Sequence, residues 1–349
     1  MDTTIRSSIL TLTFIAVITS LYFTRDLISP IALAVFIWLI IDAFASWIDS
    51  LSRRIPYWVA LKIAIMTVVI SLAGITVVVI DTAGDLIEQA PIYEARLDGL
   101  FKWASSLVGY QEENIANFIS GLNLEAKINS SLIGFASSVQ SVLSDFVTIS
   151  IYVAFLFAAQ ASFPQKIEHL FSKKSSKVKA MKIFESIRNS VKRYVSVQTI
   201  ISLIQTILSF AIMSALGLEN ALFWSLVIFI LNYIPIVGGL AAIVLPVAFG
   251  IMQFDSITPI LILTIGLFAV QFIIGNTLQP KMMGDSLNLS ALVVVLSLTL
   301  WYALWGGVGA FLSAPLTVIV MIVFAQFSTT RWLAVLLSAD GMPGASNQT

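Results

Sequence analysis

The C-terminal half of the chain contains the sequence Asn232-Tyr-Ile-Pro-Ile-Val-Gly-Gly239, which interrupts an uncharged apolar run at 220–254. One membrane span needs about 20 apolar residues, so this run exceeds one span but falls short of two spans and a turn. Pro235 removes a backbone donor, and Gly238 and Gly239 permit a sharp reversal of the chain. We therefore predict a re-entrant hairpin of two short helical arms, whose exposed backbone is buried in protein or lines a wet cavity.

A second run, 286–330, is interrupted in the same way by Trp305-Gly-Gly-Val-Gly309 and is followed by Pro315. A displacement of the first run by 69 positions brings residues of the same type into register, including five between positions 231 and 246. These pairs are Leu231 with Leu300, Tyr233 with Tyr302, Gly238 with Gly307, Ala241 with Ala310, and Pro246 with Pro315. The two runs therefore predict two related hairpins, although two ordinary helical pairs with glycine at close contacts would share this pattern.

Composition places both runs in a membrane protein. Of the 349 residues, 58% are hydrophobic and 11% charged, with a mean hydropathy of +0.96, whereas soluble domains carry about 25% charged residues. The apolar runs are continuous rather than alternating, which favours helices over a β-barrel. We predict an all-α polytopic membrane protein with about six full transmembrane helices and two hairpins arranged as an inverted repeat. The full spans are expected at 7–24, 27–48, 58–80, 142–161, 194–217 and 256–280.

The distribution of charge predicts the orientation. Nine of the 19 basic residues lie within 166–193, and Arg53 and Arg54 lie in another connection, so both segments are expected in the cytoplasm. The segment 81–141 has eight acidic and three basic residues and is expected outside. Both termini are then cytoplasmic, and the two hairpins open to opposite sides. Paired, interrupted hydrophobic segments of this kind are typical of the binding region of a transporter.

The predicted organisation follows from these segments. It comprises transmembrane helices at 1–80, an outer amphipathic segment at 81–141, a fourth helix at 142–161, a basic inner segment at 162–193, a transport core at 194–330 and a tail at 331–349. The outer segment is expected either to rest on the membrane or the protein's own outer face, or to contact a neighbouring subunit. The inner helix either binds anionic lipid or a gate, or is only a topology determinant.

Neutral polar groups dominate the apolar runs of the C-terminal half. They are Gln198, Gln205, Asn232, Gln271, Asn276, Thr277 and Gln279. Together with free backbone groups at broken helix ends, they suit a small solute that is uncharged or weakly anionic. Asp42 is the one carboxylate expected to be buried, unless it is a hydrated residue at the cytoplasmic helix end; Asp145 is a second candidate for an ion or proton site.

The residue types argue against an enzyme. The chain has one histidine, no cysteine, no phosphate-binding Gly-Lys-Ser/Thr loop and no carboxylate pair spaced for acid–base work. We therefore expect no catalytic residue, metal site, cofactor or nucleic-acid partner. Active transport would draw on an ion gradient or on a partner.

Three stretches resemble the autoinducer-2 exporter family of bacterial permeases: Asn232–Gly239, Asn276-Thr-Leu-Gln-Pro-Lys-Met-Met-Gly284, and Leu289–Pro315. The resemblance implies a transporter of the bacterial inner membrane, and a homopentamer as in at least one relative. Members are linked to export of autoinducer-2, others to exchange of sodium or lithium for protons. Gly239 stands where members often have proline, which loosens the expected hairpin tip.

Three functions remain open. In the first, the protein exports a small polar solute between hairpin tips that meet near the membrane midplane. Its gating and pathway residues would be Asn232, Pro235, Gly238, Gly239, Gln271, Asn276, Gln279, Pro280, Gly306, Gly307 and Gly309. In the second, it exchanges sodium or lithium for protons through Asp42 or Asp145. In the third, it is a membrane scaffold that transports nothing.

Overall fold

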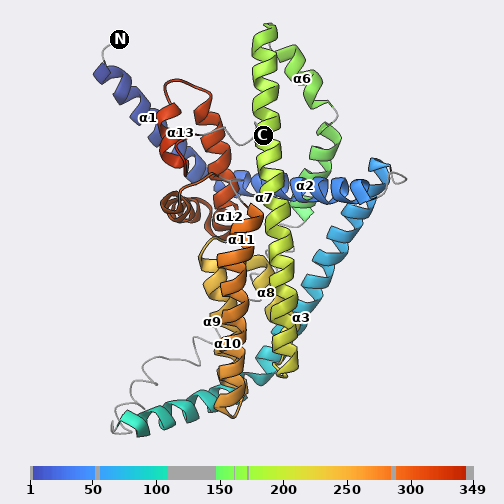
Figure 1. The fold of residues 1–349 in the computed structure, drawn as a ribbon, viewed down its shortest axis with the longest axis vertical. Helices are drawn as coiled ribbons and strands as arrows, with labels where there is room; N and C mark the ends of the chain where they lie inside the picture. The colour runs from blue at the N-terminus through green and yellow to red at the C-terminus, as the bar shows by residue number, and fades with distance from the viewer. Residues whose placement is uncertain are drawn as a thin grey trace.

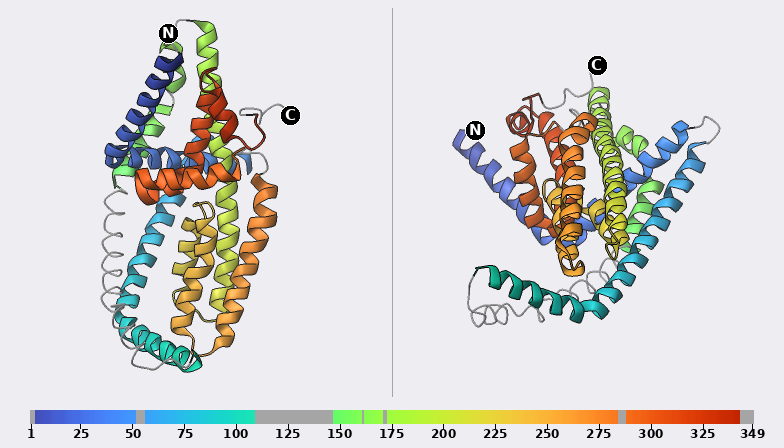
Figure 2. Two further views of the ribbon diagram at one scale, coloured as in Figure 1. Left: turned by 90° about the vertical axis from the view of Figure 1, so that its left-hand side faces the viewer. Right: turned by 60° about the horizontal axis from the view of Figure 1, so that its bottom comes forward.

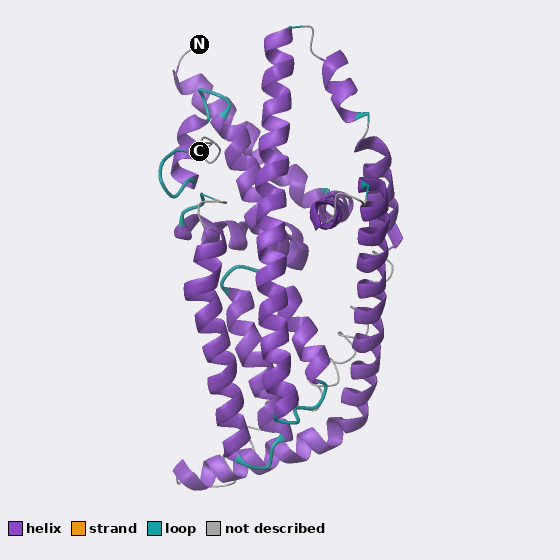
Figure 3. Ribbon diagram, turned by 45° about the vertical axis from the view of Figure 1, so that its right-hand side comes forward, coloured by secondary structure: helices purple, strands orange, loops and turns teal. Residues whose placement is uncertain are grey.

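The computed structural model describes residues 3–51, 56–108, 147–160, 162–170, 173–283 and 288–342, and nearly all of them are helical (Figures 1 and 3). The N-terminal helices are α1 Thr3–Phe23, α2 Arg25–Leu51, α3 Tyr57–Val108 and an unlabelled helix, Val147–Gln160. The others are α6 Phe163–Leu170, α7 Lys174–Ala215, α8 Ala221–Leu231, α9 Val237–Gln253, α10 Ile257–Ile273, the π-helix η1 Ile274–Leu278, α11 Gln279–Met283, α12 Ala291–Ala325 and α13 Arg331–Leu337.

Five helices of the described residues are long and apolar enough to cross a membrane: Arg25–Ser50, Tyr57–Thr82, Lys174–Ala215, Ile257–Met283 and Ala291–Ala325. The chain is therefore an all-α membrane protein, as predicted. The predicted spans 27–48, 58–80, 194–217 and 256–280 lie in or largely in four of these helices. The spans expected at 7–24 and 142–161 correspond to shorter apolar helices, Leu12–Phe23 and Val147–Gln160.

The helices do not form one parallel bundle. α7 and α10 run along the long axis of the molecule beside α8 and α9, whereas α2 lies crosswise to them in both perpendicular views (Figures 1 and 2). The helix α2 is long and apolar enough for the span predicted at 27–48, but its direction differs from that of α7 and α10. It packs on both α3 and α7.

The first interrupted run folds into the predicted pair of short arms, α8 and α9. They are joined by a turn at 232–236, in which Ile236 has a φ of 64°. A Cβ at Gly238 would collide with the carbonyl of Leu231, so the glycine allows the start of α9 to approach the end of α8. A core that includes Met213, Ile228 and Leu263 holds the arms against α7 and α10.

The second interrupted run, α12, is broken at Gly306, inside the glycine stretch that predicted the interruption. Gly306 has φ 61° and ψ −139°, outside the helical region. The two parts fold toward each other, so that Trp301 Nε1 donates to Thr317 Oγ1 at 3.1 Å. A Cβ at Gly309 would collide with the carbonyl of Trp301, and this contact therefore requires glycine.

The outer segment begins as a continuation of α3, without a helix break near position 80. The end of α3 turns to run crosswise below α9 and α10 (Figure 1). There Arg96 donates to the carbonyls of Met252, at 3.3 Å, and Gln253, and lies 3.3 Å from a carboxylate oxygen of Asp255. This part of the segment packs on the protein's own helices α8 and α9, whereas 109–141 lies outside the described residues.

Candidate functional site at the broken helices

The turn of the first hairpin is anchored to α7 by side-chain hydrogen bonds. Gln198 Nε2 donates to the carbonyl of Asn232 at 2.7 Å, and Asn232 Nδ2 donates to Ser202 Oγ at 3.1 Å. Beside them, the hydroxyls of Thr199 and Tyr233 lie 2.7 Å apart. Such contacts satisfy the backbone and amide groups that a helix end leaves without intrahelical partners. Asn232 therefore belongs to a polar network between the hairpin turn and α7, and its role in a solute pathway stays a prediction.

A second polar contact connects α7 with α10. Gln205 Nε2 donates to Gln271 Oε1 at 2.5 Å, and the Gln271 side chain lies directly against the backbone of Gly239. A Cβ at Gly239 would collide with Gln271 Nε2, so the absence of a side chain brings the first turn of α9 onto the amide pair. Three of the predicted residues thus lie where the first hairpin meets α7 and α10. Asn232 and Gly239 belong to the hairpin, and Gln271 belongs to α10.

The predicted residues that follow Gln271 lie in a less regular stretch. Asn276 is in η1, where it is exposed and donates to the carbonyl of Phe272 at 3.0 Å on its own helix. Gln279 and Pro280 begin α11. Short π-helical segments occur often at functional sites, but Asn276 does not join the amide contacts of Gln271.

The two hairpins contact each other through aromatic rings rather than through their tip glycines. The ring centroids of Tyr233 and Phe311 are 4.9 Å apart, and Phe36 of α2 lies 5.2 Å from Phe311. Pro235 is in the turn beside Tyr233. A Cβ at Gly306 or Gly307 would meet no atom within 4 Å. The break at these glycines therefore comes from the backbone conformation of Gly306 and not from a close contact at either residue. A gate at this place stays a prediction.

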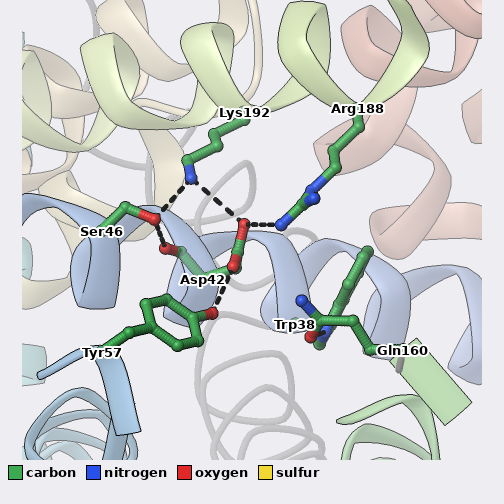
Figure 4. A network of polar contacts seen from close by, with 7 residues as sticks. All are labelled: Trp38, Asp42, Ser46, Tyr57, Gln160, Arg188 and Lys192. Atoms are coloured by element: carbon green, nitrogen blue, oxygen red, sulfur yellow. Dashed lines mark hydrogen bonds and ion pairs between the residues drawn. The ribbon is translucent and has the colours of Figure 1, made fainter. Parts of the chain in front are cut away.

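Asp42 is buried and ion-paired rather than hydrated. Its side chain is 1% exposed and lies 2.8 Å from Arg188 and 3.2 Å from Lys192, both of α7 (Figure 4). Tyr57 of α3 donates its hydroxyl to Oδ1 at 2.6 Å, and Lys192 also donates to Ser46 Oγ at 2.7 Å. One carboxylate thus faces two cations, and three helices meet at it.

This network was not predicted from the sequence, although one signal of it is present there. Arg188 and Lys192 are four residues apart, so they share one face of a helix. That face carries Lys182 too and was expected to be solvated, lipid-bound or gate-coupled. Asp145, the other predicted ion-site carboxylate, lies outside the described residues.

Comparisons with known protein sequences cover most of the chain. A sequence model of the AI-2E family transporters matches residues 11–329, which include both hairpins. The AI-2 transport protein TqsA of Escherichia coli K12 is 27% identical over 329 residues, 93% of each chain. A candidate transport protein of Haemophilus influenzae Rd is also 27% identical, over 93% of each chain. The candidate transport protein YhhT of Escherichia coli K12 is 24% identical over 93% of this chain and 91% of the relative.

Proposed function

The chain belongs to the AI-2E family of transporters, and we propose that it is a secondary transporter that exports a small polar solute, uncharged or weakly anionic, from the bacterial cytoplasm. The neutral hydrogen-bonding set at the first hairpin carries this proposal: Gln198, Ser202, Gln205, Asn232 and Gln271. A solute of this class would exchange hydrogen bonds with amides and hydroxyls without leaving a charge uncompensated in the membrane.

In this proposal, the hairpins are re-entrant, open to opposite sides and act as two gates. Pro235, Gly238 and Gly239 shape the first gate, and Gly306, Gly307 and Gly309 the second. The contact between Tyr233 and Phe311 closes the path between them. Both gates would alternate against the N-terminal helices, with the termini in the cytoplasm and 81–141 outside.

Autoinducer-2 is the first solute to test, because TqsA is named as its transport protein. The proposal also includes a homo-oligomer. In the span of α3 only 6% of the residues are buried, and in that of α10 only 17%, which leaves apolar surface for lipid or for neighbouring subunits.

A sodium or lithium/proton antiporter is the second candidate function, and the buried carboxylate of Asp42 is the observation in its favour. The ion pairs with Arg188 and Lys192 argue against it, since they already compensate the carboxylate. Replacement of both Asp42 and Asp145 by Asn should abolish antiport but only weaken export of a neutral solute.

The decisive experiment is flux in proteoliposomes that contain only this purified protein. A panel of neutral and weakly anionic solutes, including autoinducer-2, is tested against imposed proton and sodium gradients, with protein-free vesicles as the control. We expect gradient-dependent flux of at least one such solute. Proton-coupled sodium flux with no solute flux would replace the first proposal by the second, and absence of any flux would favour the scaffold.

A further inference from the structure

Gln205 and its neighbour Thr206 are the two residues of α7 that have a buried side-chain atom without a hydrogen-bond partner among the described residues, and Gln205 is the one bonded to α10. It is 1% exposed. Its Nε2 donates to Gln271, but its Oε1 is buried without a hydrogen-bond partner among the described residues. Buried acceptors in native proteins nearly always have a donor, because water no longer compensates them. The missing donor therefore points to a group that binds Gln205 at another stage of the transport cycle.

The chemistry of the amide restricts what that group can be. A primary amide can turn over about its terminal bond, which exchanges its oxygen and its nitrogen. If Gln205 and Gln271 both turned, so that Gln271 Nε2 donated to Gln205 Oε1, the NH₂ of Gln205 would be the group left without a partner. A hydroxyl both donates and accepts a hydrogen bond, so it can pair with Gln205 in either orientation.

The neighbouring hydrogen bonds involve only uncharged side chains. Gln205 and Gln271 lie beside a network in which Gln198, Ser202 and Asn232 are joined to one another. Among these contacts neither a carboxylate nor a cation is available to compensate a charged ligand, and such a ligand would lose its hydration uncompensated. The site thus favours hydroxyl groups on an uncharged molecule.

We propose that Gln205 determines specificity in the transport path by binding a hydroxyl group of an uncharged polyol or sugar. This inference rests on the proposed transport function and names the solute class for the same site. Gln205 Oε1 is covered in the described conformation, and Gly239 seats the first turn of α9 on Gln271. Movement of that turn away from Gln271 is the step that would admit the hydroxyl, so solute binding and opening of the first hairpin are coupled.

The test uses D-ribose as the hydroxyl-rich probe and Gln205→Met as the principal variant. Methionine keeps the length of the side chain but removes both hydrogen-bonding groups. We expect ribose to raise the thermal unfolding midpoint of the purified wild-type protein, and Gln205→Met to abolish this shift. Ribose uptake into proteoliposomes should fall about tenfold in the variant, the usual effect of one lost hydrogen bond to a buried polar group. Without ribose the midpoint should stay the same or rise, because the unpaired acceptor is gone.

Ser209→Ala is the matched control, because Ser209 is buried one turn further along α7. This variant should keep both the rise of the unfolding midpoint with ribose and the uptake of ribose. Gln205→Leu repeats the test with a second apolar side chain in case Gln205→Met does not fold. Retention of wild-type ribose binding and uptake by either folded apolar variant would overturn the inference.

The outcomes separate this inference from the transport proposal. If ribose stabilises the wild type but not Gln205→Met, and yet does not cross the membrane, the hydroxyl site stands and transport of this class is wrong. If ribose, xylitol and glycerol neither bind nor cross while another solute does, the hydroxyl site is wrong and the transport proposal stands.

Discussion

The ring of Tyr233 packs on the ring of Phe311 with a centroid distance of 4.9 Å, and this contact joins the turn of the first hairpin to the second part of α12. Phe36 of α2 contacts both rings, at 6.2 Å from Tyr233 and 5.2 Å from Phe311. Two segments that are each interrupted by glycine and proline are thus linked by one aromatic cluster, which also includes the crosswise helix.

Phe311→Ala should weaken this link. Removal of a buried phenylalanine costs about 3–5 kcal/mol, and because Phe311 is half-buried we expect about 2 kcal/mol. Thermal unfolding in detergent should show a lower midpoint. Tyr233→Phe is the control, since it keeps the ring and loses only the contact with Thr199; a smaller effect of Phe311→Ala than of this control would contradict the packing argument.

Two adjacent glycines of α12 should respond differently to alanine. Gly306 has a φ of 61° and a ψ that L-residues rarely adopt, so Gly306→Ala should cost about 1–3 kcal/mol and reduce flux. Gly307 has an ordinary φ and open space around it, so Gly307→Ala should be tolerated. Flux and thermal midpoints of the two variants, measured side by side, check this; equal losses would mean that backbone conformation at Gly306 is not the cause.

Asp42→Asn should be strongly destabilising, because it leaves Arg188 and Lys192 without their carboxylate. Loss of one partner of a buried ion pair lowers the free energy of unfolding by about 3–5 kcal/mol. Because the side chains of Arg188 and Lys192 are 34% and 26% exposed, we expect a loss at or below the lower end of this range. Lys192→Met should cost less, since Arg188 still pairs with Asp42. The denaturation midpoints of the two variants give the comparison, and a stable Asp42→Asn protein would show that the carboxylate is not structural.

Arg96→Gln should loosen the C-terminal end of α9. Arg96 donates to the carbonyls of Met252 and Gln253, and a cation at a helix C-terminus contributes about 0.3–1 kcal/mol. Hydrogen exchange of the amides around 250–256 should accelerate a few-fold. Asp255→Asn should change exchange little, because that carboxylate is 89% exposed. Unchanged exchange in Arg96→Gln would show that α3 does not hold this end.

Cysteine labelling tests whether the hairpins open to opposite sides. The chain has no cysteine, so Ile236→Cys and Gly307→Cys can be introduced singly. Ile236 is 65% exposed and Gly307 is exposed as well. An impermeant maleimide should label the two positions from different sides of intact vesicles; labelling of both from one side would exclude the inverted arrangement.

Features that depend on local conformational preference could be predicted from the amino-acid sequence. Run length and the scarcity of charge gave an all-α membrane protein. Pro235 and Gly238 located the break between α8 and α9, and Gly306 lies in the stretch that located the break in α12. These features follow from the backbone, because proline lacks a donor and glycine tolerates positive φ wherever they occur.

The faces on which the helices meet could not be predicted from the sequence and are seen in the folded chain. The pairing of Asp42 with Arg188 spans 146 positions, and that of Gln205 with Gln271 spans 66. The crosswise direction of α2 is likewise not encoded in its apolar run, since such a run is equally stable along or across a bundle when its partners cover it. Contacts of this kind depend on the packing of whole helices against one another, and residue periodicity describes only one helix at a time.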